Sequence, residues 1–373
     1  MYKKMIVFLF FLTVLTLHTT ALSSTDFGID TKPIINLIPD EVKEYFPDVF
    51  MVGEDAVSAA ESVNFSSLSV FFANLLKSRV KPFVKIFSTL LALVVACSVI
   101  NAAKNSIADE SMAKMICFIT MLTVSVVSYG IIKEVWHSIE EFMKRMDVLI
   151  SAMLPVMTLL YTLGGNVATA IVNSSGTAIT LSIINTVCQY GLFPFLKIIL
   201  GLSLTSSVGG FKGVEGLSKA VRTSYTVILS GIMTVFSIFL LFKTNLAIAT
   251  DGVAARTVKF AGSFIPVVGS AIGESVRSII SGLSLIKSSS GFIGILIVIF
   301  ITLPVLFEII TNKLCFDFVG GIAEMLGCEA EGKIMKEFSS ILNFALALTV
   351  TVSILFVFEL SVFINTSLAL GGG

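Results

Sequence analysis

The longest stretch without a charged side chain runs from Val148 to Leu196 and covers 49 residues. About 20 apolar residues in a helix cross the ~30 Å hydrocarbon core of a bilayer, so this stretch is too long for one spanning helix and suits two. A run of turn-forming residues, Asn173 to Gly176, lies near its middle. We therefore predict two membrane-spanning helices, at 148–172 and 177–203.

Charged residues bound several other uncharged stretches of similar length. Lys85 and Lys104 enclose 18 uncharged residues, and Lys114 and Lys133 enclose another 18. Only 13% of the side chains are charged and the mean hydropathy is +0.97, whereas a soluble domain has about 25% charged residues. The predicted fold class is all-α, a polytopic membrane protein with about seven transmembrane helices. The further spans are predicted at 86–103, 115–132, 224–242, 288–310 and 338–358, within a transmembrane domain 81–373.

The N-terminus has the pattern of a secretory signal peptide. Lys3 and Lys4 precede an apolar stretch, and the small residues around Ala21 resemble a cleavage site. We predict a signal peptide at 1–22, with an uncleaved anchor as the alternative. Residues 23–80 are more polar and acidic, which predicts a small extracytoplasmic helical region. Basic residues occur in nearly every loop, so orientation rests on the signal, which would leave the C-terminus in the cytoplasm.

The segment between Lys133 and Asp147 is amphipathic. Glu140 and Lys144, and likewise Glu141 and Arg145, stand four residues apart on its polar face. Such a helix either lies in the membrane interface or packs its apolar face against protein, and the sequence leaves both open. The apolar face carries Val135, Trp136, Ile139, Phe142, Met143 and Met146.

Residues 260–286 are apolar but rich in glycine and proline, and Glu274 and Arg277 interrupt them. A broken or re-entrant element is tolerated at membrane depth where protein or a water-filled cavity covers its backbone. The alternative is a loop followed by a short interfacial helix. If the element is re-entrant, Pro266, Gly269 and Gly273 are candidates to shape a conduit.

A weak internal repeat joins two parts of the chain. Pro194, Leu196 and Val208-Gly209-Gly210 match Pro304, Leu306 and Val319-Gly320-Gly321 with one residue of slippage. The match reflects either a duplication or chance similarity between apolar windows. It predicts helix kinks at the prolines, since an internal proline removes a backbone hydrogen bond, and turns at the Gly-Gly pairs. The residues assigned to kinks and turns are Pro155, Pro194, Pro304, Gly209, Gly210, Gly320 and Gly321.

Motifs for enzyme chemistry are absent from the sequence. After signal removal only His137 remains of the histidines, so a histidine metal site or catalytic triad has little to work with. No P-loop, zincin helix or dinucleotide fingerprint occurs. With 25 basic and 25 acidic residues there is no electrostatic basis for binding nucleic acid. We predict no enzyme activity, no cofactor and no metal site.

Three charged residues at the ends of spans are candidates for lining a conduit or coupling to ions: Lys197, Glu308 and Glu359. Ionisable groups at membrane depth are costly and commonly line a cavity or pair with one another. The alternative is that all three snorkel to the interface and only mark helix ends. Of the five cysteines, Cys315 and Cys328 are the one pair that could form a disulfide, although free thiols are the simpler reading.

The order of these features, together with the segment from Lys259 to Ser275 that contains Phe-Ile-Pro-Val-Val-Gly, resembles the stage III sporulation protein AE family. The resemblance covers essentially the whole chain. It implies a multi-pass protein of the mother-cell membrane around the forespore, acting as a pore or export-gate component. Its implied partners, besides membrane lipid, are ring-forming proteins and a secretion-type ATPase of a channel complex.

The leading hypothesis is therefore a non-enzymatic membrane subunit of a multiprotein transport channel used in endospore formation. A second hypothesis is a stand-alone secondary transporter, with Glu308 or Glu359 coupling to protons and the substrate bound beside Pro266. A third is a membrane scaffold that recruits ring-forming partners through residues 23–80.

Overall fold

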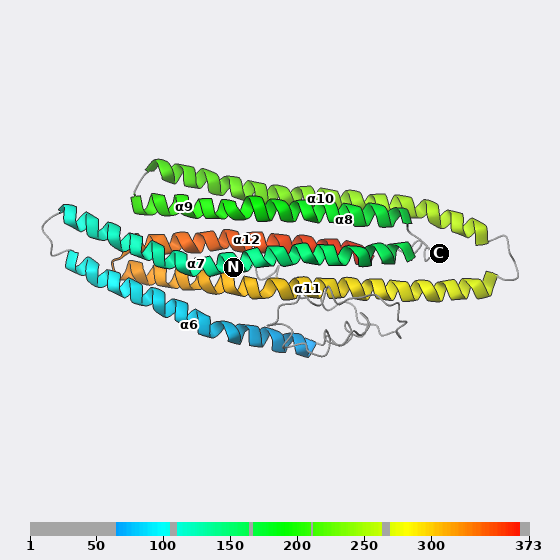
Figure 1. Cartoon of the computed structure of the whole chain (residues 1–373), viewed down its shortest axis with the longest axis horizontal. Coiled ribbons are helices and arrows are strands. Elements are labelled where there is room, and N and C mark those ends of the chain that lie inside the picture. Colours follow the sequence, from blue (N-terminus) through cyan, green and yellow to red (C-terminus); the bar gives the residue numbers. More distant parts are fainter. Residues whose placement is uncertain (1–64, 105–109, 164–166, 210–211, 263–268, 366–373) are drawn as a thin grey trace.

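The structure, a computed structural model, describes residues 65–104, 110–163, 167–209, 212–262 and 269–365. Within these ranges every regular element is a helix and no strand occurs, which confirms the predicted all-α fold. The long helices lie side by side and alternate in direction (Figure 1). The predicted signal peptide at 1–22 and most of the predicted region 23–80 lie outside the described residues, and Phe65 to Val80 belong to the first helix.

Six helical rods make up the described bundle. The third rod is continuous but includes a π-helical segment, and the first, second and fifth rods carry Pro82, Pro155 and Pro304 inside them. The elements are α6 (Phe65–Lys104), α7 (Glu110–Leu163), α8 (Val167–Thr186), the π-helix η1 (Val187–Leu192), α9 (Phe193–Gly209), α10 (Lys212–Gly262), α11 (Gly269–Met325) and α12 (Glu329–Asn365).

Six helices in the described part of the chain are long and apolar enough to cross a membrane, against about seven predicted. The difference arises in α7, which joins the predicted span 115–132, the amphipathic segment and the start of span 148–172 in one helix. No glycine or proline stands between Lys133 and Val148 to interrupt the backbone hydrogen bonds. Two predicted spans therefore share one helix.

The predicted break at Asn173–Gly176 lies inside α8. The helices part instead at residues 164–166, ten residues earlier, and those three residues lie outside the described ranges. Asparagine and serine favour turns only weakly when packing favours a helix. At Gly176 an added β-carbon would stand 3.5 Å from the ring of Phe239 on α10, so the small residue permits close packing there.

The core of the bundle is the antiparallel pair α11–α12. All residues of α11 from Gly294 to Val305 are buried, and α12 also contacts α7, α8, α9 and α10. Such burial on every side is what an apolar helix without a polar face requires. The outer helices α6 and α10 instead expose large apolar side chains, including Val80, Val99, Val227 and Val235. The outer surface of these helices is therefore suited to lipid.

A tight turn at Leu326–Cys328 connects α11 to α12. Gly327 has φ +76°, a left-handed conformation that glycine adopts without strain. The Cys328 amide donates to the Ala323 carbonyl at 2.8 Å and closes the end of α11. Glu329 and Glu331 in the first turn of α12 suit the positive end of its helix dipole.

The amphipathic segment of α7 packs against protein. All six residues of its predicted apolar face, from Val135 to Met146, are buried. The Trp136 ring meets the Phe193 ring edge to face, with centroids 5.6 Å apart. On the other face Lys144 lies 3.6 Å from both Glu140 and Glu141. Of the two alternatives, the structure adopts packing in the bundle and not an isolated interfacial helix.

Candidate functional site

The structure places the three candidate charged residues in separate surroundings. Glu308 of α11 accepts a hydrogen bond of 2.9 Å from the Ser138 hydroxyl of α7 and lies 3.7 Å from the Arg79 guanidinium of α6. The carboxylate therefore connects three helices at one level of the bundle. Both charged side chains are about four-fifths covered, so the pair is partly shielded from solvent.

Glu359 of α12 is completely buried. The Thr177 hydroxyl of α8 donates a short hydrogen bond to its carboxylate. A small pocket of about 20 Å³ adjoins the carboxylate, which is roughly enough for one water molecule. Apolar side chains of α7 form most of the remaining wall, among them Met153 and Met157. An ionisable group buried within a membrane helix is a pointer to function.

Lys197 lies on the exposed side of α9, and its ammonium stands 4.6 Å from the centroid of the Phe193 ring. This cation–π contact is typical of a partly solvated lysine. Lys197, Glu308 and Glu359 are on three different helices, and no contact joins them in the described part of the structure. They do not form one site.

One of the three candidate kink prolines lies next to a local irregularity of the helix. Pro194 follows the π-helix η1, where the amide of Phe193 donates to the Cys188 carbonyl five residues back. The wider π-helical turn gives room for the proline ring, and such segments often mark functional sites. Pro155 lies inside α7 beside a shallow surface hollow, and Pro304 lies in the buried stretch of α11.

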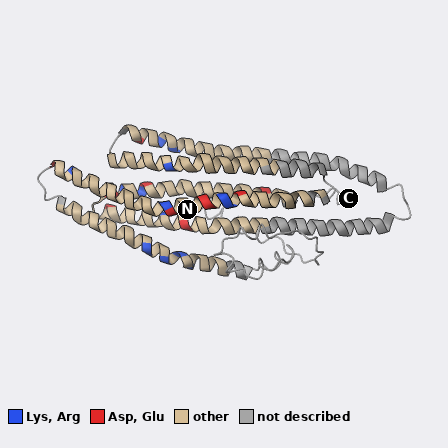
Figure 2. Ribbon diagram, viewed as in Figure 1, with Lys and Arg blue, Asp and Glu red and all other residues tan. Residues whose placement is uncertain are grey.

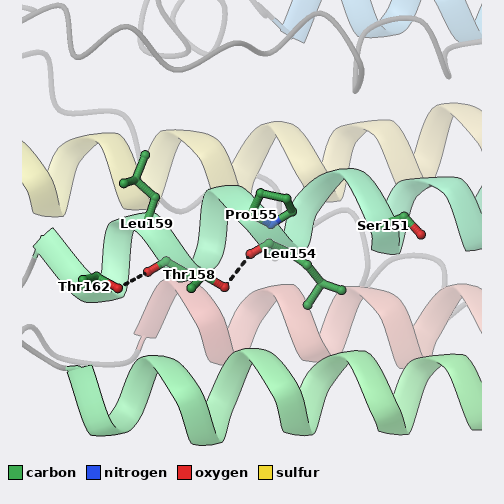
Figure 3. Close-up of a pocket in the computed structure, with 6 residues that line it drawn as sticks. All are labelled: Ser151, Leu154, Pro155, Thr158, Leu159 and Thr162. Carbon is green, nitrogen blue, oxygen red and sulfur yellow. Dashed lines mark hydrogen bonds between the residues drawn. The ribbon is translucent and has the colours of Figure 1, made fainter.

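Figure 3 shows the hollow beside Pro155. All six residues that line it belong to α7, so it is a depression along one helix and not a cleft between elements. The Thr158 hydroxyl donates to the Leu154 carbonyl at 2.8 Å, and the Thr162 hydroxyl donates to the Thr158 carbonyl at 2.7 Å. The lining residues are Ser151, Leu154, Pro155, Thr158, Leu159 and Thr162.

The predicted turn at Gly320–Gly321 is wrong, because both residues lie inside α11 and the turn follows at Gly327. The glycine serves helix packing instead: a β-carbon on Gly320 would stand 3.4 Å from the Gly332 carbonyl of α12. Gly209 is the last residue of α9 and fits the other predicted turn, whereas Gly210 lies outside the described residues.

The described parts of the predicted re-entrant region 260–286 are helix ends. Gly262 ends α10 and Gly269 begins α11, which continues through Gly273 as regular helix. Pro266 lies outside the described residues. The two alternatives for this region differ at residues 263–268, which lie outside the described residues, so both stay predictions.

Two polar clusters emerge from the structure that the sequence analysis did not single out. Glu331, only 1% exposed, accepts hydrogen bonds from Thr120 of α7 at 2.6 Å and Asn101 of α6 at 3.2 Å. Arg222 of α10 donates to Ser203 of α9 and to Glu337 of α12. Polar residues inside the predicted spans, such as Thr120, were the available signal, because polar side chains between transmembrane helices commonly hydrogen-bond across them.

All five cysteines are thiols, so the suggested pairing of Cys315 with Cys328 is not formed. Among the described residues no three or more His, Cys, Asp and Glu side chains lie close enough to hold a metal ion. In the part of the chain that the structure describes, the Glu331 and Arg222 clusters join helices to one another, and a small pocket adjoins Glu359. The geometry of the two clusters is that of cross-links within the bundle.

Comparison with known proteins identifies the family of this chain. The family model described as stage III sporulation protein AE matches residues 44–367. The stage III sporulation protein AE of Bacillus subtilis (strain 168) is 24% identical over 286 residues, which cover 75% of this chain and 71% of that protein. No solved structure matches. This chain, whose described elements are all helices and include several able to span a membrane, belongs to the stage III sporulation protein AE family.

Proposed function

We propose that the chain is a non-enzymatic membrane subunit of a multiprotein transport channel that links mother cell and forespore during endospore formation. Family membership supports the role in sporulation, and the six apolar helices support a place in the membrane. The proposed location is the mother-cell membrane around the forespore, with the N-terminal region outside the cytoplasm. The proposed partners are ring-forming proteins and a secretion-type ATPase.

The observation that carries the subunit role is a pair of apolar belts at different levels of the bundle. The first, the tip belt, consists of residues 86–103 of α6 and 115–132 of α7. The second, the main belt, includes residues 288–307 of α11 and 338–358 of α12. Neither belt contains a charged side chain, and each segment is long enough for a ~30 Å hydrocarbon core.

Side-chain contacts fix the levels of the two belts. Thr120 of the tip belt hydrogen-bonds Glu331, just past the α11–α12 turn. Met153, much later on α7, reaches within 3.1 Å of the position that a β-carbon on Gly294 of the main belt would occupy. The two contacts are separated along α7 by about 33 residues, or roughly 50 Å at 1.5 Å per residue.

The belts adjoin, because the α12 segment of the main belt begins seven residues past Glu331, but from the Thr120 contact to the Gly294 contact they extend together over roughly 50 Å. A single flat bilayer with a ~30 Å core cannot cover that whole length. The part left outside the bilayer needs contact with protein, because exposed apolar patches mark interaction sites. Apolar side chains exposed on the tip belt are Val95, Val99, Ile100, Met115, Phe118, Ile119, Leu122 and Val126. The chain is therefore better suited to act as a subunit of a protein assembly than to act alone.

A second candidate function, a stand-alone secondary transporter, is favoured by the buried Glu359. Its pocket, however, measures about 20 Å³, whereas small-molecule sites measure about 300–1,000 Å³. In this conformation the pocket suits a water or a proton and not an organic solute. The scaffold hypothesis, which depends on residues 23–80, concerns a region that is largely outside the described residues.

Purification of the chain, followed by a transport assay, distinguishes these candidate functions. The full chain, tagged at its C-terminus and extracted with mild detergent from sporulating cells, should bring down ring-forming proteins and an ATPase, and should move no solute when reconstituted alone in liposomes. A matched tag on an unrelated polytopic protein of the same membrane is the control. Recovery of the chain by itself, together with solute uptake that Glu308→Gln or Glu359→Gln abolishes, would support the transporter and reject the channel subunit.

A further inference from the structure

The second half of α7 lies at the level of the main belt. At one end Ser138 donates to Glu308, and at the other end Met153 packs against Gly294. Between Gly294 and Phe307 α11 has no charged residue, and these 14 residues extend about 21 Å. The part of α7 that runs alongside them should consequently be apolar on any surface that faces lipid.

The outward surface of α7 at this level carries a line of polar residues, with the apolar Val148 and Leu159 exposed beside it. From His137 to Ser151 the polar residues recur at intervals of three or four, and Thr158 and Thr162 continue the line beyond Pro155. The opposite face, from Val135 through Met146 to Leu160, is buried and apolar. We name the outward line the α7 polar stripe; its members are His137, Glu140, Lys144, Asp147, Ser151, Thr158 and Thr162, and Glu141 lies beside Glu140.

The charged residues at one end of the stripe are unfavourable in contact with lipid. Asp147 is exposed and stands nine residues beyond Ser138, which is about 14 Å deeper into the main belt. A charged side chain at such depth costs several kcal/mol, and the aspartate side chain is too short to snorkel that far. Figure 2 shows the charged residues of α7 gathered near the middle of the helix, between two uncharged stretches.

A neighbouring helix shows what a lipid-facing surface looks like at the same level. Asn185 of α8 donates to the Met143 carbonyl at 3.2 Å, so α8 and the stripe run side by side. The exposed residues of α8 there include Ile179 and Ile183, each close to 60% exposed. The main belt consequently has an apolar side at α8 and a polar side at α7.

We propose that the α7 polar stripe is the wall of a water-filled conduit within the membrane section of the assembly. The proposal rests on the proposed function and names the surface that faces the transported material. The charged end carries the argument, because Ser151, Thr158 and Thr162 donate their hydroxyl protons to carbonyls of their own helix. Their oxygens remain acceptors for water. Both signs of charge occur, which suits hydrated solutes more than one fixed ion.

Cysteine accessibility tests the proposal in the full chain. The parent is Cys117→Ser, because the other four cysteines are buried and Cys117 is partly exposed. Single cysteines replace Lys144, Ser151 and Thr158 on the stripe, and Ile179 and Ile183 on α8 as matched controls. The probe is a membrane-impermeant disulfonated stilbene maleimide, applied to right-side-out and inside-out membranes of sporulating cells. Thiols react as thiolates, which form in water, so the stripe should react about tenfold faster than the controls or more.

Two results would overturn the proposal. If stripe and control cysteines both stay unreacted in membranes and react only in detergent, lipid or another chain covers the stripe. If both sets react equally fast, this section of the bundle lies in water. Failure of the proposed function gives a different pattern. If the stripe cysteines react faster than the controls but the purified chain brings down no partner protein, the water-filled conduit is supported and the multiprotein channel is rejected.

Discussion

The two halves of α7 expose opposite kinds of side chain. In the first half the exposed residues are large and apolar, such as Phe118, Leu122 and Val126, whereas Thr120 and Ser128 are buried. In the second half Phe142 and Met153 are buried and the polar stripe is exposed. One uninterrupted helix thus has a surface suited to an apolar environment and then a surface suited to water. The pattern of buried and exposed residues, more than the mean hydropathy, distinguishes the two halves of α7.

The largest expected effect comes from the core of the second half. Phe142→Ala should lower the free energy of unfolding in detergent by about 3–5 kcal/mol, since it removes a fully buried aromatic ring. Phe118→Ala in the first half, where the ring is 47% exposed, is the matched control and should cost under about 1 kcal/mol. Chemical denaturation followed by tryptophan fluorescence measures both. Equal losses would remove the contrast between the halves.

A charge on the outside of the first half should be the next most damaging change. Ile119→Lys places an ammonium on the exposed face of the tip belt and should cost about 2.5–3.5 kcal/mol if lipid covers that face. Reduced recovery of the chain in the membrane, or of partners in a pull-down, reports the loss. Asp147→Lys in the second half is the control. Normal recovery of Ile119→Lys in both assays would show that the tip belt faces water.

The buried polar residues of the first half should contribute an intermediate amount. Thr120→Val removes the 2.6 Å hydrogen bond to the buried Glu331 carboxylate and should cost about 1–3 kcal/mol. Thr123→Val is the control, because that exposed hydroxyl bonds only to the Ile119 carbonyl of its own helix. The difference between the two midpoints of denaturation is the measured quantity. A Thr120→Val midpoint at or above that of Thr123→Val would contradict the role given to Glu331.

The smallest effect belongs to the polar stripe. Lys144→Met removes ion pairs of 3.6 Å with Glu140 and Glu141 at half-exposed positions, and such pairs contribute at most about 0.5 kcal/mol. The free energy of unfolding should hardly change. The proposed transport should change instead, measured as the yield of spores in a strain that carries the variant. A large loss of stability would show that Lys144 stabilises the fold and would contradict its role as a residue that lines the conduit.

The sequence predicted the features that depend on composition and short-range pattern. The uncharged stretches identify membrane helices, and the spacing from Val135 to Met146 identifies the face of α7 that is buried. The Glu140–Lys144 pair was predicted and is present. These features follow from helix periodicity, which needs no knowledge of neighbouring helices.

The features that the sequence did not predict depend on which helices meet. Nothing local to Glu331 indicates that Thr120 and Asn101, more than 200 residues away, supply its hydrogen bonds. The sequence around Gly320 predicts a turn, and only the contact with Gly332 shows that this glycine permits close helix packing. The offset between the two belts likewise requires the register of α7 against α11. Long-range packing of this kind is fixed by side-chain fit over many residues, and residue-type preferences do not encode it.

A nitroxide scan along α7 tests the central claim, that its two halves face different environments. Single labels at the exposed positions from Met115 to Tyr129 and from Lys144 to Thr162 would be examined in the assembled membrane complex by electron paramagnetic resonance. Collision rates with apolar oxygen and with a polar nickel chelate would be compared. We predict that oxygen dominates in the first half and the nickel chelate in the second. The same ratio throughout both halves would contradict the account.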